Sequence, residues 1–223
     1  MLNIDLKKLA KPIIYQDKIL LMGSCFTEHI GNAFEELKFS TLQNPNGILF
    51  DPVSVCKSLV SYIQNKKYAE ADLFLLNEVW HSWNHHSRFS NMNPAEAVHI
   101  INASQQRAHE FLKEADWIII TLGSSFCYRL NSTQSPQSGS VGEPVANCHR
   151  APAQWFTKHL LEIDEVRSML NDCLHQLLEF NPKLNIIFTV SPVRHIRDGV
   201  VENNRSKARL IESVHQMVSR FEQ

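Results

Sequence analysis

A serine that directly follows an apolar run is the residue best placed for chemistry in this 223-residue chain. Residues 18–22 are typical of a buried strand, Gly23-Ser24 ends the run, and residues 27–39 carry the apolar spacing of an amphipathic helix. This order places a hydroxyl at the carboxyl edge of a parallel sheet, beside the free N–H groups of the following helix. Ser24 is therefore either a nucleophile or a serine that only caps the helix, and the spacing alone leaves both open.

A serine hydroxyl needs a base before it can attack an acyl group, and two histidines are candidates for that base. His149 lies in a loop shortly after Asn147, and His195 follows the end of a strand near Ser191. Histidine titrates near neutral pH, as a general base requires. The alternatives are structural: His149 would shape its loop through a backbone hydrogen bond, and His195 would be a surface residue. Asp198 is the carboxylate that could orient His195.

His81, His85 and His86 form the densest cluster of imidazoles in the chain. If their segment were helical, His81 and His85 would share a face and could bind zinc. However, no glutamate stands beside His81 and no distant ligand is marked. We therefore predict no metal site, and we expect the cluster and its tryptophan neighbours to line a substrate pocket.

The thiol of Cys25 is an alternative nucleophile because it lies at the expected N-terminus of the helix. Its other reading is a thiol that packs beneath the turn. The five cysteines are widely spread and include no C-x-x-C pair. This usage favours reduced thiols in a cytoplasmic protein, and we expect no structural zinc and no cofactor.

Composition argues against two classes of partner. The formal net charge is -1, so the chain lacks the basic surface that nucleic acids require. Residues 1–11 have no apolar core of a signal peptide, and no apolar run approaches the ~20 residues of a membrane span. We expect neither a nucleic-acid nor a membrane partner, and the sequence indicates no oligomeric state.

Strand-like and helix-like segments alternate along the chain. Further strands are expected over residues 38–42, 116–122 and 185–190, and a hairpin over 74–83 that turns at Asn77-Glu78. Helices are expected over 52–63 with Asp51 as N-cap, 94–114 behind Asn93, 164–180 and 202–221, and a loop over 131–144. The pattern predicts a single domain over residues 1–223 with an α/β fold, three layers and a doubly wound, mostly parallel sheet.

Several short motifs together resemble one protein family. Gly23-Ser24-Cys25-Phe26 is similar to the signature of GSCFA-domain proteins, with Thr27 in place of the final alanine. The resemblance continues through residues 44–49 (NPNGIL), 122–124 (LGS), 147–149 (NCH) and 191–194 (SPVR). These proteins look like relatives of the SGNH (GDSL-type) ester hydrolases, which implies an SGNH/flavodoxin-like fold.

The resemblance also implies roles for individual residues. Ser24 matches the SGNH nucleophile, and its backbone N–H would form an oxyanion hole together with Gly47. Gly123 is retained from the third SGNH block, but Ser125 occupies the position of that block's asparagine. Asn147 is our candidate replacement because its amide can donate a hydrogen bond to an oxyanion.

The resemblance implies an Asp-x-x-His block after the last strand, and residues 196–223 contain none. Three explanations are open. The sequence is a fragment that lacks the C-terminal strand and helix of its domain, or the base comes from elsewhere, or the protein is not a working hydrolase. We favour the fragment.

The function implied by these residues is that of an SGNH-like serine ester hydrolase or acyltransferase. Its partner would be a small-molecule ester, an O-acyl compound such as an acetylated carbohydrate. The alternative is a catalytically silent module that binds a small molecule or glycan at the same rim.

Overall fold

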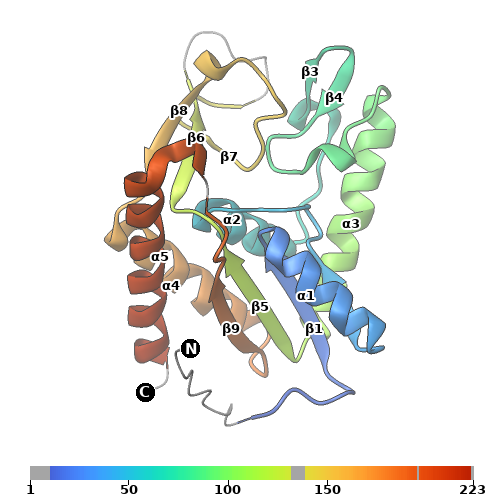
Figure 1. The fold of residues 1–223 in the computed structure, drawn as a ribbon. Coiled ribbons are helices and arrows are strands. Elements are labelled where there is room, and N and C mark those ends of the chain that lie inside the picture. The colour runs from blue at the N-terminus through green and yellow to red at the C-terminus, as the bar shows by residue number, and fades with distance from the viewer. Residues whose placement is uncertain (1–10, 132–138, 195, 222–223) are drawn as a thin grey trace.

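A four-stranded parallel sheet forms the centre of the protein (Figure 1). The computed structural model describes residues 11–131, 139–194 and 196–221. The strand order is β2-β1-β5-β9, and each neighbouring pair is parallel. The strands are β1 (Lys18–Gly23), β2 (Ser40–Gln43), β5 (Trp117–Leu122) and β9 (Asn185–Val190). Their positions agree closely with the sequence prediction.

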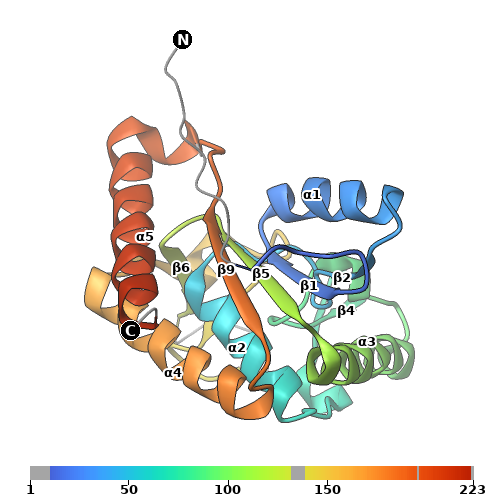
Figure 2. The ribbon, with the colours of Figure 1, turned by 90° about the horizontal axis from the view of Figure 1, so that it is seen from below.

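Helices cover both faces of this sheet (Figure 2). One face packs on α1 (Cys25–Glu36). The other packs on α2 (Pro52–Ile63), α3 (Pro94–Glu114) and α4 (Ile163–Phe180), and α5 (Gly199–Phe221) runs beside β9. The predicted three-layer α/β fold is confirmed.

Side-chain caps explain why two of the helices begin where they do. Asp51 accepts a hydrogen bond from the N–H of Ser54 at the start of α2, and Asn93 does the same for Ala95 at the start of α3. Both caps precede a proline in the first turn, as the sequence predicted. The predicted end of the first helix at residue 39 is too late: α1 ends at Glu36, and Leu37 beyond it is 66% exposed.

Two small antiparallel sheets lie beyond the carboxyl edge of the central sheet (Figure 1). The predicted hairpin is present as β3 (Phe74–Leu76) and β4 (Val79–His81). The second sheet was not predicted, and its order is β7-β6-β8, with β6 (Phe126–Leu130), β7 (Pro144–Val145) and β8 (Phe156–Leu160). Short 3-10 helices connect these parts at Glu70–Asp72, Ser87–Phe89, Ala153–Trp155 and Ile196–Asp198.

The register of the strands brings their carboxyl ends to one edge. Gly23 pairs with Thr121, and Thr121 pairs with Thr189 on the next strand. Ser24, Gly123 and Ser191 follow β1, β5 and β9 by one residue each, so all three stand at that edge, as predicted.

None of the helices in the described part of the chain is long and apolar enough to cross a membrane. All five cysteines are unpaired in the structure.

Candidate active site

Ser24 is buried at the N-terminus of α1. The residue is 1% exposed and takes the N-cap position, but its hydroxyl makes no capping hydrogen bond. Within the described part of the chain, the Ser24 Oγ atom has no hydrogen-bond partner at all. The backbone is engaged, because the Ser24 N–H donates to the Thr121 carbonyl at 3.1 Å. Ser24 is thus placed like a cap without acting as one.

Gly23, the residue before Ser24, has a backbone conformation that other residues cannot adopt at this turn. Gly23 has φ +132°, and a Cβ atom there would lie 2.0 Å from the carbonyl oxygen of Thr121. Its N–H donates to the side-chain oxygen of Asn44 at 2.9 Å. The end of β1 is therefore fixed to both neighbouring strand ends.

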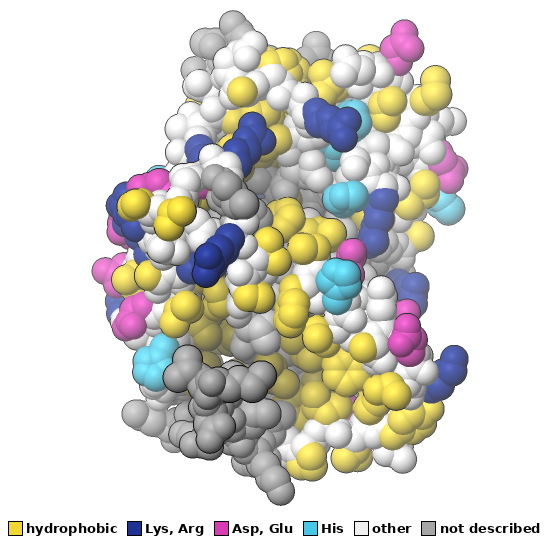
Figure 3. Space-filling view, in the orientation of Figure 1, with side chains coloured by type: hydrophobic (Ala, Val, Ile, Leu, Met, Phe, Trp, Pro, Cys, Tyr) yellow, Lys and Arg dark blue, Asp and Glu magenta, His cyan; other side chains and the backbone are white. Residues whose placement is uncertain are grey.

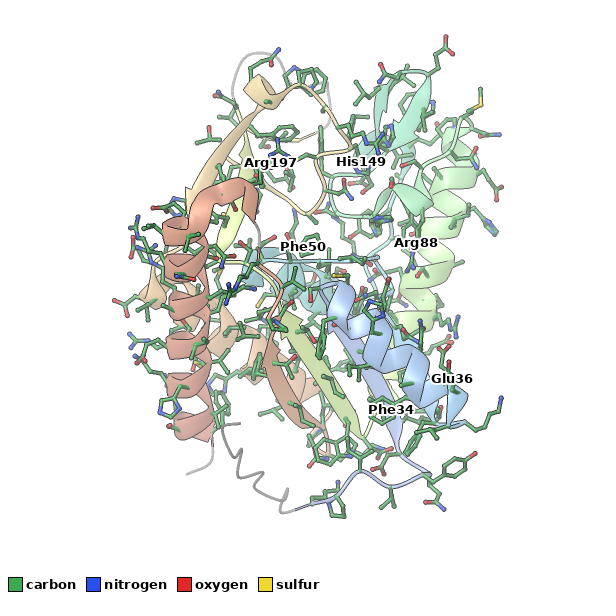
Figure 4. The ribbon with its side chains drawn as sticks, viewed as in Figure 1. Phe34, Glu36, Phe50, Arg88, His149 and Arg197 are labelled. Atoms are coloured by element: carbon green, nitrogen blue, oxygen red, sulfur yellow. The ribbon has the colours of Figure 1, made fainter. Side chains whose placement is uncertain are left out.

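Phe50, which is labelled in Figure 4, lies against Gly123 at this edge. A Cβ atom built on Gly123 would lie 3.0 Å from Cδ1 of Phe50 and 3.3 Å from Cβ of Ser24. The Phe50 carbonyl accepts hydrogen bonds from the N–H groups of Gly123 and Ser124, at 2.7 and 2.9 Å. The Phe50 ring and the Ser24 side chain thus both lie close to Gly123, and the loop that carries the ring is hydrogen-bonded to the tip of β5.

A cavity of about 440 Å³ opens above Phe50, towards the sheet formed by β6, β7 and β8. Its volume is in the range of small-molecule sites. Its walls include Phe50, Phe126, Tyr128, Asn147, Lys158 and Arg197. Ser24 is not among the lining residues, although Ser124 is. The buried serine is therefore not part of the cavity wall.

The walls combine aromatic rings with charged groups. Lys158 forms an ion pair with Asp198, and its ammonium also lies 3.9 Å from the ring centroid of Phe126. Among the lining residues, burial raises the pKa of Asp51, even though Ser54 donates hydrogen bonds to that carboxylate.

Figure 3 shows the face of the molecule seen in Figure 1. Apolar side chains gather across its middle and below, and basic side chains lie above and at the sides.

The backbone donors predicted for the oxyanion hole already have partners inside the fold. The N–H of Gly47 donates to the Asn44 carbonyl at 2.7 Å, and the N–H of Gly123 donates to Phe50. Ser125 is fully buried, and its hydroxyl donates to the Ser206 carbonyl at 3.1 Å. The donor groups of Gly47, Gly123 and Ser125 are therefore all engaged within the fold. Their roles in an oxyanion hole stay predictions.

Asn147 lines the cavity, as expected of a substrate contact. Its side-chain oxygen accepts a hydrogen bond from the N–H of His149 at 2.8 Å. That bond fixes the loop, which turns through a left-handed His149 (φ 49°). Asn147 is therefore positioned by its neighbour to face a ligand, and its oxyanion role stays a prediction.

His149 is packed into an aromatic cluster and is not bonded to the Ser24 hydroxyl. Its Nε2 atom lies 2.8 Å from the Ser82 carbonyl, which a ring N–H would satisfy. The rings of Phe74, His81 and Trp83 surround it. Burial lowers its pKa to about 4, so His149 is a weak base at neutral pH. The other candidate base, His195, lies outside the described residues.

The His81–His86 segment is strand and turn rather than helix, so the geometry needed for the zinc alternative is absent. His85 is fully buried against Tyr68 and Phe89, its Nδ1 atom lies 2.8 Å from the Ser82 hydroxyl, and burial lowers its pKa to about 3. Of the cluster predicted to line a pocket, His86 lines the cavity, whereas His81, His85 and the neighbouring tryptophans do not. Across the described residues, no group of three metal-ligating side chains comes together.

Two polar residues at the sheet edge were missed by sequence reasoning. Asn44 follows β2 and is 1% exposed, and its Nδ2 atom has no partner within the described residues. Lys207 on α5 donates to the carbonyls of Gly123 and Ser191, which joins the ends of β5 and β9. Only the position of Asn44 directly after a strand could have pointed to it. Nothing in the helical spacing of residues 202–221 distinguishes Lys207 from a solvent-facing lysine.

Comparison with known proteins gives one result. Comparisons with curated proteins and with solved structures returned no match. The model of the GSCFA family matches residues 18–223, which includes every site described above. The chain therefore belongs to the GSCFA family.

Proposed function

We propose that this protein is an SGNH-like serine hydrolase or acyltransferase in which Ser24 is the nucleophile. The observation that carries the proposal is the unpartnered Ser24 hydroxyl. Leaving a buried hydroxyl without a hydrogen bond costs about 1–3 kcal/mol, and a serine kept only for structure would cap its helix instead. A group held at such a cost is typical of a catalytic site.

The proposed reaction is acyl transfer from a small O-acyl ester. The Ser24 oxygen bonds to the acyl carbon and gives a tetrahedral intermediate. The bond to the alcohol oxygen then breaks, and the alcohol leaves with the proton that the serine lost. Water or a second alcohol releases the acyl group in the same way. The aromatic walls of the cavity offer stacking surfaces for a sugar ring.

The base that moves this proton is proposed to be His195. His195 stands five residues beyond the end of β9, whose tip shares the edge with Ser24. His149 is the weaker candidate because its pKa is low and its Nε2 atom is held at the Ser82 carbonyl.

Labelling with a fluorophosphonate tests the nucleophile, because this probe bonds to activated serines. We expect one adduct, located on Ser24 by peptide mass spectrometry, and none in Ser24→Ala. The matched control is Ser191→Ala. Ser191 is also buried at this edge, but its hydroxyl accepts a hydrogen bond from Val193, so that variant should still label on Ser24. Labelling elsewhere, or none in the unmodified protein, contradicts the proposal.

The burial of Ser24 favours a second candidate, a binding module without turnover. Ser24 is 1% exposed and does not line the cavity, whereas the cavity itself is accessible. In that case acetylated sugars would bind in calorimetry, with equal affinity for the unmodified protein and Ser24→Ala, and no probe adduct would form.

A further inference from the structure

Asn44 is held in place through nearly every polar atom that it has. Its N–H donates to the Leu21 carbonyl at 2.8 Å, and its own carbonyl accepts from the Gly47 N–H and from Arg88 (labelled in Figure 4). Its side-chain oxygen accepts from the Gly23 N–H at 2.9 Å. Because that partner can only donate, the oxygen of the amide must face Gly23 and the NH₂ group must point the other way.

This NH₂ group is the one part of Asn44 without a partner within the described residues. Asn46, two positions along the same segment, is equally buried at 1% exposure. Its NH₂ group donates to the Ser58 hydroxyl at 3.0 Å, and its oxygen accepts from the Tyr62 hydroxyl at 2.8 Å. The side chain of Asn46 is thus hydrogen-bonded through both its oxygen and its NH₂ group, whereas the NH₂ group of Asn44 has no partner in the described part of the chain.

Two unpartnered polar atoms therefore follow adjacent strands, Ser24 after β1 and Asn44 after β2. The Asn44 oxygen is bonded to the residue that precedes Ser24, and the Ser24 hydroxyl is an unpartnered buried atom of the same edge. Attack by that hydroxyl creates a negative charge on the former carbonyl oxygen of the acyl group. A fixed N–H donor next to the nucleophile is the group that stabilises such a charge.

We propose that the Asn44 side-chain amide donates the hydrogen bond that stabilises the oxyanion formed on Ser24. This inference rests on the proposed function. It assigns Asn44 the role for which Ser125 and Asn147 were candidates. Ser125 is committed to Ser206, and the oxygen of Asn147 is committed to His149.

Asn44→Asp is the sharpest test because it replaces only the NH₂ group and keeps the oxygen that Gly23 needs. With a nitrophenyl acetate substrate we expect kcat to fall at least about 100-fold and KM to change little, because the bond forms in the transition state. Affinity for an alkyl boronic acid, which becomes tetrahedral on the serine, should fall by a similar factor.

A second variant covers the case in which a buried aspartate prevents folding. Asn44 has φ 40°, a left-handed conformation that glycine adopts without strain, so Asn44→Gly should fold and still lose about 100-fold in kcat. Asn46→Asp is the matched control. It breaks a structural hydrogen bond and should lower the melting temperature, but its kcat per folded molecule should stay near that of the unmodified protein.

The outcomes separate the two proposals. If Ser24→Ala retains turnover, the proposed function fails. If Ser24→Ala abolishes turnover but Asn44→Asp or Asn44→Gly keeps kcat within about threefold, the role of Asn44 is overturned and Ser24 remains the nucleophile.

Discussion

Within the described part of the chain, four of the five buried side-chain atoms without partners fall in two regions whose surroundings differ, and the fifth is Oδ1 of Asn171 on α4. At the edge of the central sheet they are the Ser24 hydroxyl and the Asn44 NH₂ group. Under the β3–β4 hairpin they are Nε2 of His85 and Nδ1 of His149.

At the sheet edge, Ser24 is the N-cap residue of α1, the Asn44 oxygen is bonded to the residue before it, and the nearby Phe50 and Ser124 line a cavity. Under the hairpin, the unpartnered nitrogens are ring atoms enclosed by aromatic side chains, and the pKa values of both imidazoles are lowered by burial. A neutral imidazole can be buried as part of an aromatic cluster, whereas a serine next to a cavity gains nothing from packing. An unpartnered buried polar atom therefore points to function only where a bound ligand could supply the missing hydrogen bond.

Ser24→Ala should give the largest effect. If the hydroxyl is the nucleophile, ester turnover falls by at least about 10⁴-fold, as for other catalytic serines. The free energy of unfolding should rise or stay unchanged, because an unsatisfied buried hydroxyl is removed. Turnover and urea denaturation check the two parts, and a loss of stability of 1 kcal/mol or more would show a structural serine.

His195→Ala tests which region supplies the base. We expect kcat to fall by about 10³–10⁴-fold, with KM little changed, because proton transfer fails in the transition state. His149→Asn should act mainly on stability, since it removes a ring from an aromatic cluster. If His149→Asn lowered kcat by this factor and His195→Ala did not, the base would be His149 of the hairpin region.

Phe50→Ala tests whether the aromatic ring limits access to Ser24. Removing it should raise the rate of fluorophosphonate labelling by about tenfold, because the ring stands against Gly123 next to the serine. Tyr128→Ala is the control: Tyr128 has the same 38% exposure and lines the same cavity, and its loss should change the rate less. Equal rates for both variants would mean that the ring does not cover the serine.

The pH dependence of stability should include a contribution from the buried His85 of the hairpin region. Burial lowers the pKa of His85 to about 3, so as the pH falls below about 6.5 the unfolded chain takes up a proton first and stability is lost. His85→Phe should reduce the slope of unfolding free energy between pH 4 and 6.5 by about 1.4 kcal/mol per pH unit. An unchanged slope in His85→Phe would contradict a buried neutral imidazole.

The central sheet was predictable because its signals are local. Apolar runs ending in Gly-Ser, and helices opening on Asp51-Pro52 and Asn93-Pro94, depend on residues that are neighbours in sequence. The sheet of β6, β7 and β8 was missed because its strands are short and pair over a long separation, as Arg129 does with Thr157. The end of α1 was placed too late because periodicity does not mark where a helix stops.

The candidate site divides in the same way. Sequence alone determined that Ser24 follows the first strand of a parallel sheet and that Gly123 and Ser191 end at the same edge, because strand direction fixes where the ends meet. Only the tertiary structure decided that Phe50 lies against Gly123, that Ser125 is bonded to α5, and that Asn44 keeps an open donor. Hydrogen-bond partners from distant segments compete for each polar atom, and that competition is resolved only when the chain has folded.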